Sequence, residues 1–516
     1  MIFSNIIDTL KKIKEAWVIH PFVFALFPFL FLFSNNLGHV YFYQIIMPAT
    51  ITLILTCFFF LLSIIIIKDF KKAGIIVSIC LILFFSYGHI YNIIKAWQLS
   101  NDSIIHIHRY LLISWIAIFG SITIITLKQT NKLTHLTRAI NFGSLLLFLN
   151  PIFLIVLYYY EIENNESKDI VDDKIYSMNT GNNNGSFFPD IYYIIPDGHA
   201  SSLTLKENFN YDNSDFSNFL IDKGFYIAEK SQSNYMMTPT SLSSSLNMNY
   251  LSKDYDPNNL QIKNNKVINL LKSLGYKYIH FSSGWSHTDH NILADINIKC
   301  GAMDEFIMIL LPTTILRSFE EKMSFLKSAR RDKLLCVFSK LSEMDKIVGP
   351  KFVFVHLETP HPPYVFGRNG EMISNTNMTM IGWHPKEAYL DQLIFTQKKL
   401  KDIINTLLNK SERNPIIIVQ SDHGPATTFA HQEDPLAYQP TDKNIVERMS
   451  IINAYYLPES NCSDLLYNEI SPVNSFRLIF NCYFDSKFDY LEDLSYYNWK
   501  HSNGFINVTN IVKNNR

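Results

Sequence analysis

Five apolar stretches near the N-terminus constrain the fold of this chain more than any other feature. In chain order they run over Trp17–Ser34, Gln44–Ile67, Gly74–Ile94, Tyr110–Leu127 and Phe142–Tyr160. An α-helix needs about 20 predominantly apolar residues to cross the hydrocarbon core of a bilayer, and each stretch is close to that length. A cleavable signal peptide explains only one of them. The sequence therefore predicts a transmembrane domain of about five helices over residues 1–160.

The loops between the predicted helices alternate in charge. Basic residues occur before the first stretch, after the second and after the fourth, at Lys11, Lys12, Lys14, Lys68, Lys71, Lys72, Lys128, Lys132 and Arg138. Because loops rich in Lys and Arg stay on the cytoplasmic side, the N-terminus is expected inside. Five crossings then place everything after Glu161 outside. We expect a bacterial inner-membrane protein whose larger domain faces the periplasm or the exterior.

One predicted outer loop carries polar residues that allow two interpretations. His106, His108 and Arg109 lie beside the start of the fourth apolar stretch. They are either ordinary interfacial residues or contacts for an anionic lipid headgroup.

Composition changes after the last apolar stretch. Residues 1–160 carry eleven Lys/Arg and four Asp/Glu, which leaves 34 basic and 42 acidic residues for the remainder. That mildly acidic remainder has no basic patch, so no nucleic-acid partner is expected. Residues 161–186 are rich in Asn, Asp, Ser and Gly and are interpreted as a flexible linker, leaving residues 187–516 as an extracytoplasmic domain.

Short, β-prone apolar runs recur through the predicted outer domain. They are Asp190–Pro196, Tyr276–Phe281, Phe352–Leu357, Ile416–Gln420 and Ile451–Leu457. Helical patterns lie between them, at Ser214–Lys223, Lys266–Ser273 and Lys386–Leu408. Continuous apolar strands that alternate with helices are typical of an α/β fold with a mainly parallel central sheet.

The six cysteines include no CxxC pair, so a cysteine metal site is not expected. Cys462 and Cys482 fall in the predicted outer domain. They either form a disulfide in an oxidising compartment or remain unpaired core residues.

Polar side chains follow three of the predicted strands. Asp197 and Gly198 follow the first, Glu358 and His361 follow the strand at Phe352–Leu357, and Asp422 and His423 follow the strand at Ile416–Gln420. Ligands gather beyond the carboxyl ends of parallel strands, so these groups are expected at one rim. Carboxylates and imidazoles suit a divalent metal, zinc or manganese, and we expect one or two ions held by Asp197, Asp422 and His423.

Thr238 is the candidate nucleophile. Proline favours the first helical position, so Pro239 predicts a helix with Thr238 as its N-cap. A hydroxyl there faces free backbone N–H groups and the positive end of the helix dipole, which favour an alkoxide and a bound phosphate. Thr238 is also a predicted metal ligand. Thr240, Ser241 and Ser243 are its rivals, and a purely capping role is the alternative.

Five further residues are candidate substrate or second-metal contacts. His361 is expected to bind a second metal or an ester oxygen, with His356 or Glu358 assisting. Trp285, beside His287 in a polar loop, is either a pocket residue or a packed loop residue. Arg448 is expected either to clamp an anion or to pair with a nearby acid.

These residues resemble the alkaline phosphatase superfamily, specifically its sulfatase-like branch. Asp197-Gly198 resembles the leading metal ligand, Thr238 the nucleophile, His361 the mid-domain histidine and Asp422-His423-Gly424 the paired metal ligands. A helical membrane domain joined to such a domain is similar to lipoteichoic acid synthases and lipid A phosphoethanolamine transferases. Both groups of enzymes usually have Glu at the position of Asp197, and the Asp-Gly pair is closer to phosphodiesterase members.

The resemblance implies a reaction at phosphorus rather than sulfur. Sulfatases carry Cys or Ser in a C/S-x-P-x-R signature, whereas this chain has Thr238-Pro239-Thr240-Ser241-Leu242. It implies transfer of a phosphoglycerol or phosphoethanolamine group from a phospholipid to a cell-surface glycan or lipid through a phosphothreonine. The alternatives are a phosphodiesterase, phosphatase or sulfuric ester hydrolase that uses water, and an inactive scaffold for surface assembly.

Overall fold

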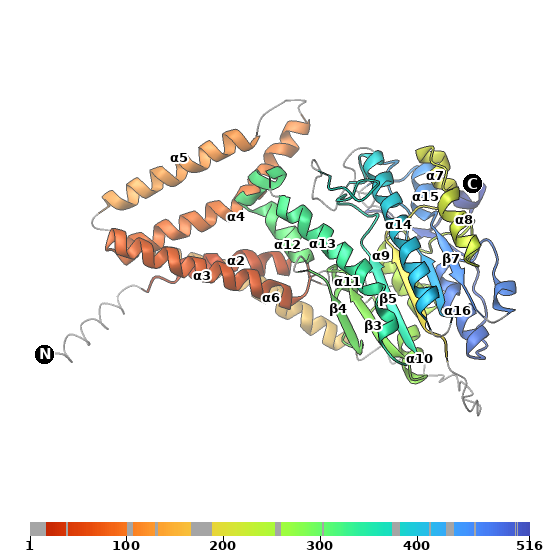
Figure 1. The fold of residues 1–516 in the computed structure, drawn as a ribbon. Coiled ribbons are helices and arrows are strands. Elements are labelled where there is room, and N and C mark those ends of the chain that lie inside the picture. The colour runs from red at the N-terminus through yellow and green to blue at the C-terminus, as the bar shows by residue number, and fades with distance from the viewer. Residues whose placement is uncertain are drawn as a thin grey trace. The chain divides into compact units, whose positions relative to one another are not determined.

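The computed structural model groups the chain into two compact units (Figure 1). One unit comprises Met1–Asp172 with Asp304–Lys322, and the other comprises Asp173–Met303 with Met323–Arg516. The structure describes residues 17–37, 40–100, 107–129, 133–166, 188–252, 260–301, 304–322, 324–373, 382–411, 414–429, 438–458, 461–500, 502 and 504–515. Lys11, Lys12, Lys14, His106, Lys132 and residues 167–186 of the predicted linker lie outside the described residues.

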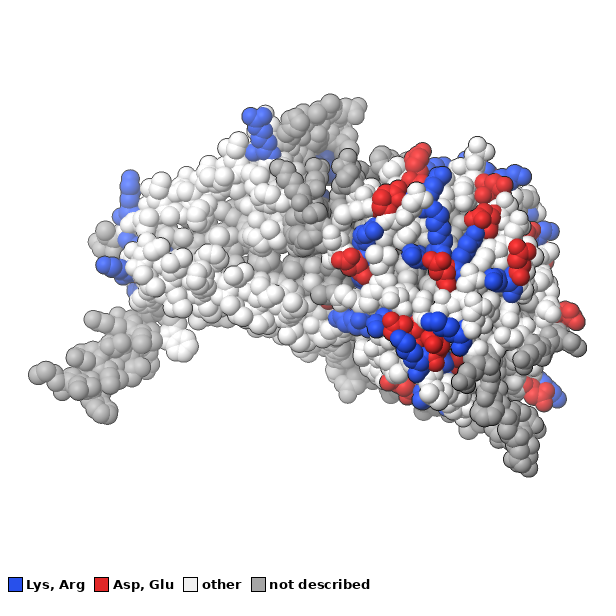
Figure 2. All heavy atoms as spheres, viewed as in Figure 1, with Lys and Arg blue, Asp and Glu red and all other residues white. Residues whose placement is uncertain are grey.

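The first unit is built from apolar helices. They are α2 (His20–Ser34), α3 (Phe42–Ile67), α4 (Phe70–Ser100), α5 (Ile107–Lys128) and α6 (Leu133–Glu166). Among the described residues, four helices are long and apolar enough to cross a membrane, within α3, α4, α5 and α6. The helix α2 is apolar but has only 15 residues. On the face shown in Figure 2, few charged side chains interrupt the helical unit, as expected for a surface that contacts lipid.

The start of α2 is tied to α6 by one side chain. The backbone N–H groups of Ile19 and His20 donate to Oδ1 of Asn141 over 3.2 and 3.1 Å. The first N–H groups of a helix have no partner within the helix, and leaving them unpaired in an apolar environment costs free energy. Asn141 therefore helps to hold these two helices together.

A segment from the middle of the chain packs with these helices. It contains α12 (Glu305–Leu310) and the 3₁₀ turns η1 (Leu311–Thr313) and η2 (Ile315–Lys322). Phe306 is fully buried in a cluster with Phe29, Phe33 and Phe85, which contributes roughly 2 kcal/mol of hydrophobic stabilisation. From the sequence this segment is expected within residues 187–516, because its apolar run is too short to indicate a helical bundle, whereas the structure groups it with the first unit.

The second unit contains a seven-stranded sheet in the order β2-β7-β6-β1-β5-β3-β4. Its strands are β1 (Ile191–Pro196), β2 (Tyr226–Ile227), β3 (Lys277–Ser282), β4 (Ile296–Lys299), β5 (Lys351–Leu357), β6 (Ile416–Gln420) and β7 (Asn453–Tyr456). The strands from β6 to β4 run parallel, whereas β7 is antiparallel to both β6 and β2. The predicted α/β fold with a mainly parallel sheet is confirmed.

Helices surround this sheet. They are α7 (Ser202–Phe209), α8 (Ser214–Asp222), α9 (Thr238–Asn247), α10 (Lys266–Ser273), α11 (Ser286–Asp289), α13 (Ser324–Leu341), α14 (Lys386–Lys410), α15 (Asp442–Met449), α16 (Pro472–Tyr483) and α17 (Thr509–Asn514). Two 3₁₀ turns, η3 (Met344–Lys346) and η4 (Asn461–Leu465), and a small sheet of β8 (Tyr496–Tyr497) and β9 (Ile506–Asn507) complete the unit. Every residue of β1, β5 and β6 is buried, which explains why these strands are apolar on both faces.

Four cysteines of the second unit are paired. The disulfides join Cys300 to Cys336 and Cys462 to Cys482, with Cα–Cα distances of 5.8 and 5.9 Å. Of the two interpretations open for Cys462 and Cys482, the structure has the disulfide.

Candidate active site

The parallel register brings residues from three strands to one rim. Within the sheet β1 lies between β5 and β6, and Pro196 at the end of β1 is opposite Leu357 of β5. Asp197 directly follows β1. Asp422 follows β6 after one intervening residue, and His356 is the penultimate residue of β5. Side chains that are far apart in the sequence therefore meet at the carboxyl ends of the strands.

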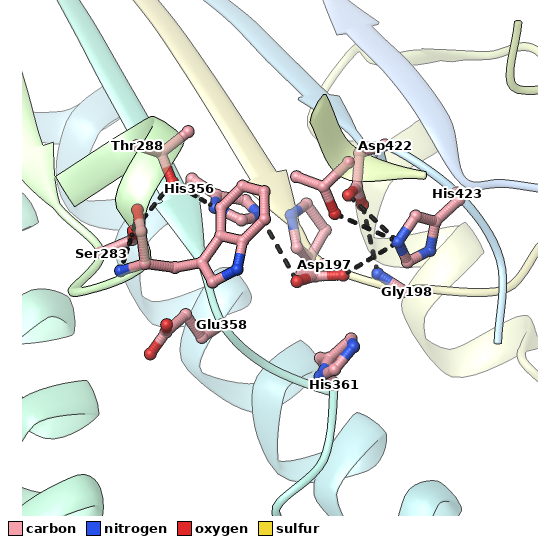
Figure 3. Close-up of polar contacts among 12 residues, drawn as sticks. Asp197, Gly198, Ser283, Thr288, His356, Glu358, His361, Asp422 and His423 are labelled. Atoms are coloured by element: carbon pink, nitrogen blue, oxygen red, sulfur yellow. Dashed lines mark hydrogen bonds and ion pairs between the residues drawn. The ribbon is translucent and has the colours of Figure 1, made fainter. Parts of the chain in front are cut away.

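Asp197 is the centre of this group (Figure 3). Its Oδ2 lies 3.4 Å from Nε2 of His356, and its Oδ1 lies 3.6 Å from Nε2 of His423. Nε2 of His423 is also 3.4 Å from Oδ2 of Asp422. Figure 3 shows His356 and His423 on opposite sides of the Asp197 carboxylate. The geometry thus places His356, expected from the sequence only as an assisting group, beside Asp197, one of the four predicted ligands.

The group has the properties of a cation site. One ligand atom each from Asp197, His356 and Asp422 lies within 4.8 Å of the others, and all three residues are buried. Oδ1 of Asp197, Oδ2 of Asp422 and Nε2 of His356 accept or donate no hydrogen bond among the described residues. Burying ionised carboxylates without partners costs several kcal/mol unless a cation compensates their charge. Two carboxylates and two imidazoles fit zinc or manganese.

The protonation of His423 suits a metal ligand. Burial, followed by the positive charge of Arg448, lowers the pKa of His423 well below its ordinary value. The ring is therefore neutral. Its Nδ1 lies 3.0 Å from the carbonyl oxygen of Gly424, which only accepts. Nδ1 thus carries the proton, and the lone pair is on Nε2, the atom that faces Asp197 and Asp422.

His356 and Asp197 stabilise each other's charged forms, so the pKa of His356 is raised and that of Asp197 is lowered. Burial lowers the pKa of His356, but the adjacent Asp197 carboxylate outweighs burial, and the net shift of the pKa is upward. For Asp197, burial raises the pKa, while interactions with His361, His356 and Arg448 outweigh burial and lower it. A proton held by this pair must leave before His356 binds a metal, so metal affinity is expected to depend on pH.

Thr238 lies against the same group. Its Oγ1 is 3.2 Å from Nε2 of His423. The helix α9 begins at Thr238, and the extended residue Met237 is its N-cap, one residue earlier than the sequence predicted. Pro239 occupies the second helical position, where its missing N–H costs nothing. The hydroxyl therefore still lies in the first turn, beside the positive end of the helix dipole.

The rival hydroxyls are engaged elsewhere. Oγ1 of Thr240 donates to the carbonyl oxygen of Met237 over 3.0 Å, and Oγ of Ser241 donates to the carbonyl oxygen of Asp422 over 2.7 Å. Ser243 is buried on the same helix. Among the described residues of α9, Thr238 is thus the one whose hydroxyl has a recorded contact with the His423 imidazole.

Glu358 lies beside the rim but pairs with two basic side chains rather than with the metal-site residues. Its Oε2 is 3.3 Å from Nη1 of Arg330 and 2.9 Å from Nζ of Lys333, two side chains of α13 that are buried with it. Burial raises the pKa of Glu358, but Lys333 and then Arg330 outweigh it, and the pKa is lowered. Glu358 is therefore an ionised member of a buried charge cluster, and its Oε2 already has two cationic partners.

His361 and Arg448 converge on a tryptophan that the sequence had not suggested. The ring of Trp383 lies 4.7 Å from the His361 ring and 5.4 Å from the Arg448 guanidinium. Nε and Nη1 of Arg448 donate to the carbonyl oxygens of Met236 and Gly424 over 2.8 and 2.9 Å. In the described part of the chain Arg448 forms no ion pair within 4.0 Å, so it braces the backbone on both sides of the site.

Trp285, the remaining candidate, packs near His356. The half-buried ring of Trp285 packs 4.9 Å from His287 and 6.1 Å from His356. Behind His356, the hydroxyl of Thr288 lies 2.8 Å from Nδ1. No residue spacing in the sequence relates Thr288 to the strand that carries His356.

Comparison with known proteins supports the kinship suggested by the sequence. Residues 231–446 match the sulfatase family model, which confirms that the second unit carries a sulfatase-like domain. No curated protein matches the chain.

Several solved structures are similar in fold. The zinc-bound C-terminal periplasmic domain of EcEptC from Escherichia coli shares 13% identity over 63% of this chain and 93% of its own, with a TM-score of 0.46. Lipooligosaccharide phosphoethanolamine transferase A from Neisseria meningitidis shares 13% identity over 83% and 86%, with a TM-score of 0.40. The lipoteichoic acid synthase LtaP from Listeria monocytogenes shares 12% over 60% and 77%, with a TM-score of 0.39.

Proposed function

We propose that the chain is a membrane-anchored, metal-dependent phosphotransferase with Thr238 as its nucleophile. One observation carries the proposal: Oγ1 of Thr238 lies 3.2 Å from Nε2 of His423, beside the buried carboxylates of Asp197 and Asp422. The match of residues 231–446 to the sulfatase family supports an ester-bond chemistry. A threonine cannot become the formylglycine of sulfatases, which favours phosphate over sulfate as the group transferred.

The residues supply activation and charge stabilisation. When bound to Asp197, His356, Asp422 and His423, a divalent ion supplies positive charge that lowers the pKa of a nearby hydroxyl and offsets charge on a phosphoryl group. Oγ1 of Thr238, 3.2 Å from Nε2 of His423, would lie beside the ion, whose charge would make this hydroxyl easier to deprotonate. The free N–H groups of the first turn of α9 are placed to bind phosphoryl oxygens.

Two displacements complete the transfer. In the first, a bond forms between Oγ1 of Thr238 and phosphorus, the bond from phosphorus to the lipid oxygen breaks, and diacylglycerol leaves with a proton. In the second, an acceptor hydroxyl attacks phosphorus, gives up its proton, and releases threonine. His361 is expected to contact the ester oxygens from its position against Trp383.

A lipid donor explains why the domain is joined to apolar helices. The four membrane-capable helices hold the chain at a bilayer, where phospholipids are concentrated. We propose the bacterial inner membrane, with the catalytic domain outside, phosphoglycerol or phosphoethanolamine as the group, and a surface glycan or lipid as the acceptor. The two disulfides are consistent with an oxidising compartment.

Labelled lipid distinguishes transfer from hydrolysis. The full-length protein in detergent is incubated with phospholipid labelled in its headgroup, a divalent metal and a cell-envelope extract. We expect diacylglycerol and a labelled acceptor in equal amounts. Diacylglycerol with label only in water-soluble phosphate esters would mean that water is the acceptor. Thr238→Ala should abolish both products, whereas Ser243→Ala, a buried hydroxyl of the same helix, should leave them unchanged.

A further inference from the structure

A polar and aromatic cluster lies within the helical unit, apart from the candidate active site. It consists of Tyr87, Tyr91 and Asn92 of α4, His108 of α5 and Arg317 of η2, and is called the Arg317 cluster below. The membrane-capable parts of α4 and α5 end at Lys95 and begin at Ile107. The cluster is therefore at the membrane end where these two helices meet the Asp304–Lys322 segment, at the depth of lipid headgroups.

The ring of Tyr91 organises the cluster. The His108 ring stacks on it at 4.3 Å, and the Arg317 guanidinium lies 4.2 Å from its centroid. Nδ1 of His108 is 3.0 Å from the hydroxyl of Tyr87, which is fully buried. Aromatic packing of this kind fixes a guanidinium in place without neutralising its charge.

The partners recorded for Arg317 among the described side chains are neutral groups. Nη1 donates to Oδ1 of Asn92 over 2.7 Å and approaches the carbonyl oxygen of Pro312 at 3.4 Å. Among the side chains that the structure describes, a set that leaves out Glu320 and Glu321, no carboxylate forms an ion pair with Arg317 and no acceptor is recorded for its Nε or Nη2. A half-buried guanidinium beside apolar helices costs free energy, and binding an anion would lower that cost.

The segment that carries Arg317 is held closely against α4. A Cβ atom at Gly88 would lie 1.9 Å from the carbonyl oxygen of Pro312 and 2.6 Å from Cα of Thr313. Only glycine permits this approach, so the backbone just before Arg317 is anchored to the helix that carries Tyr91 and Asn92. The guanidinium is thus presented by a built scaffold rather than by a loose surface turn.

We propose that the Arg317 cluster binds a phosphate anion, supplied by the headgroup of a phospholipid. Arg317 would donate from Nε and Nη2 to the phosphodiester oxygens, since a guanidinium presents paired N–H groups that match phosphate geometry. The acyl chains would lie along the exposed apolar side chains of α4 and α5, such as Ile93 and Ile113. This site does not involve Thr238 or a metal, so it stands independently of the proposed function.

Photo-cross-linking tests the site by mapping which peptides the lipid probe labels. The full-length protein in vesicles of phosphatidylglycerol and phosphatidylcholine is irradiated with a phosphatidylglycerol probe that carries a diazirine near its phosphate. We expect adducts on peptides of the Arg317 cluster. Arg317→Ala should reduce these adducts roughly tenfold, the effect of losing a charge-assisted contact, and Arg317→Lys should retain part of them. Equal labelling of Arg317→Ala and the wild type would overturn the proposal.

Two further variants separate binding from packing. Asn92→Ala removes the side-chain acceptor of Nη1 but leaves the guanidinium, so labelling should persist. A loss as large as that of Arg317→Ala would mean that Arg317 only braces the segment. Arg138→Ala, which changes an arginine of α6 outside the cluster, should have no effect.

Competition identifies the source of the phosphate. Unlabelled phosphatidylglycerol should suppress the adducts, whereas diacylglycerol, which lacks the phosphate, and millimolar inorganic phosphate should not. Suppression by inorganic phosphate at the same concentration as the lipid would show a site for the free ion and contradict a lipid ligand. Suppression by diacylglycerol would show that only the acyl chains are recognised.

Discussion

The hydroxyl of Thr288 lies 2.8 Å from Nδ1 of His356, on the side of the ring that faces away from Asp197. This contact orients Nε2 towards the carboxylates, and partners of this kind usually change metal affinity by 10- to 100-fold when removed. Thr288→Val should therefore weaken zinc or manganese binding by roughly tenfold or more. Competition with a chelator measures the affinity, and Thr427→Val, another buried threonine, is the control. Unchanged affinity in Thr288→Val would exclude His356 as a ligand.

Gly198 positions Asp197 through its backbone. It has φ +75°, and a Cβ atom there would lie 2.3 Å from the ring of Trp383. Gly198→Ala should displace either the turn or Trp383 and lower transfer activity by at least about tenfold, since misplacing a catalytic group slightly is costly. Gly275→Ala is the matched control, because Gly275 also has positive φ, +87°, but nothing lies within 4 Å. Equal activity losses in both variants would point to general destabilisation.

Glu358 should stabilise the fold at neutral pH. Its pKa is lowered in the folded state, so its contribution is fully present above the ordinary glutamate pKa and is lost as pH falls through the folded value. Glu358→Gln leaves Arg330 and Lys333 without a buried counter-charge and should cost about 3 kcal/mol at pH 7. Thermal unfolding as a function of pH measures the difference from wild type, which should shrink at acidic pH. A difference that does not depend on pH would contradict the ionised cluster.

Both disulfides should be present in the isolated protein. They close loops with sequence separations of 36 and 20 residues, and each is expected to contribute roughly 3 kcal/mol to the free energy of unfolding. Alkylation of the denatured protein without reductant should modify only Cys57 and Cys80. After reduction it should modify all six cysteines. Four or more modified residues before reduction would contradict the pairing and the proposed oxidising compartment.

Much of the fold follows from local sequence patterns. The runs that became β1, β5 and β6 are continuous and apolar because every residue in them is buried, and such runs are visible without a structure. The rule that ligands gather at strand ends then brings Asp197, Asp422 and His423 together. The apolar run at Ile451–Leu457 also indicates a strand, but its antiparallel direction depends on its pairing with β6, which no local pattern encodes.

The rest of the site depends on tertiary contacts. His356 lies inside β5, where a histidine usually indicates a packed residue, and only the register with β1 places it beside Asp197. Trp383 reaches Gly198 from a loop 185 positions further along the chain. The grouping of Asp304–Lys322 with the helical unit also depends on tertiary contacts, because Phe306 and Leu310 form too short an apolar pattern to indicate their partners.

The central claim is that Thr238 carries the phosphoryl group between donor and acceptor. Intact-mass analysis of the full-length protein, exposed to phospholipid and divalent metal without acceptor, tests it most directly. We predict a mass increase of one phosphoglycerol or phosphoethanolamine group, mapped by peptide sequencing to Thr238 and absent from Thr238→Ala. An adduct on Thr240 or Ser241 instead, or diacylglycerol release by Thr238→Ala at the wild-type rate, would contradict the account.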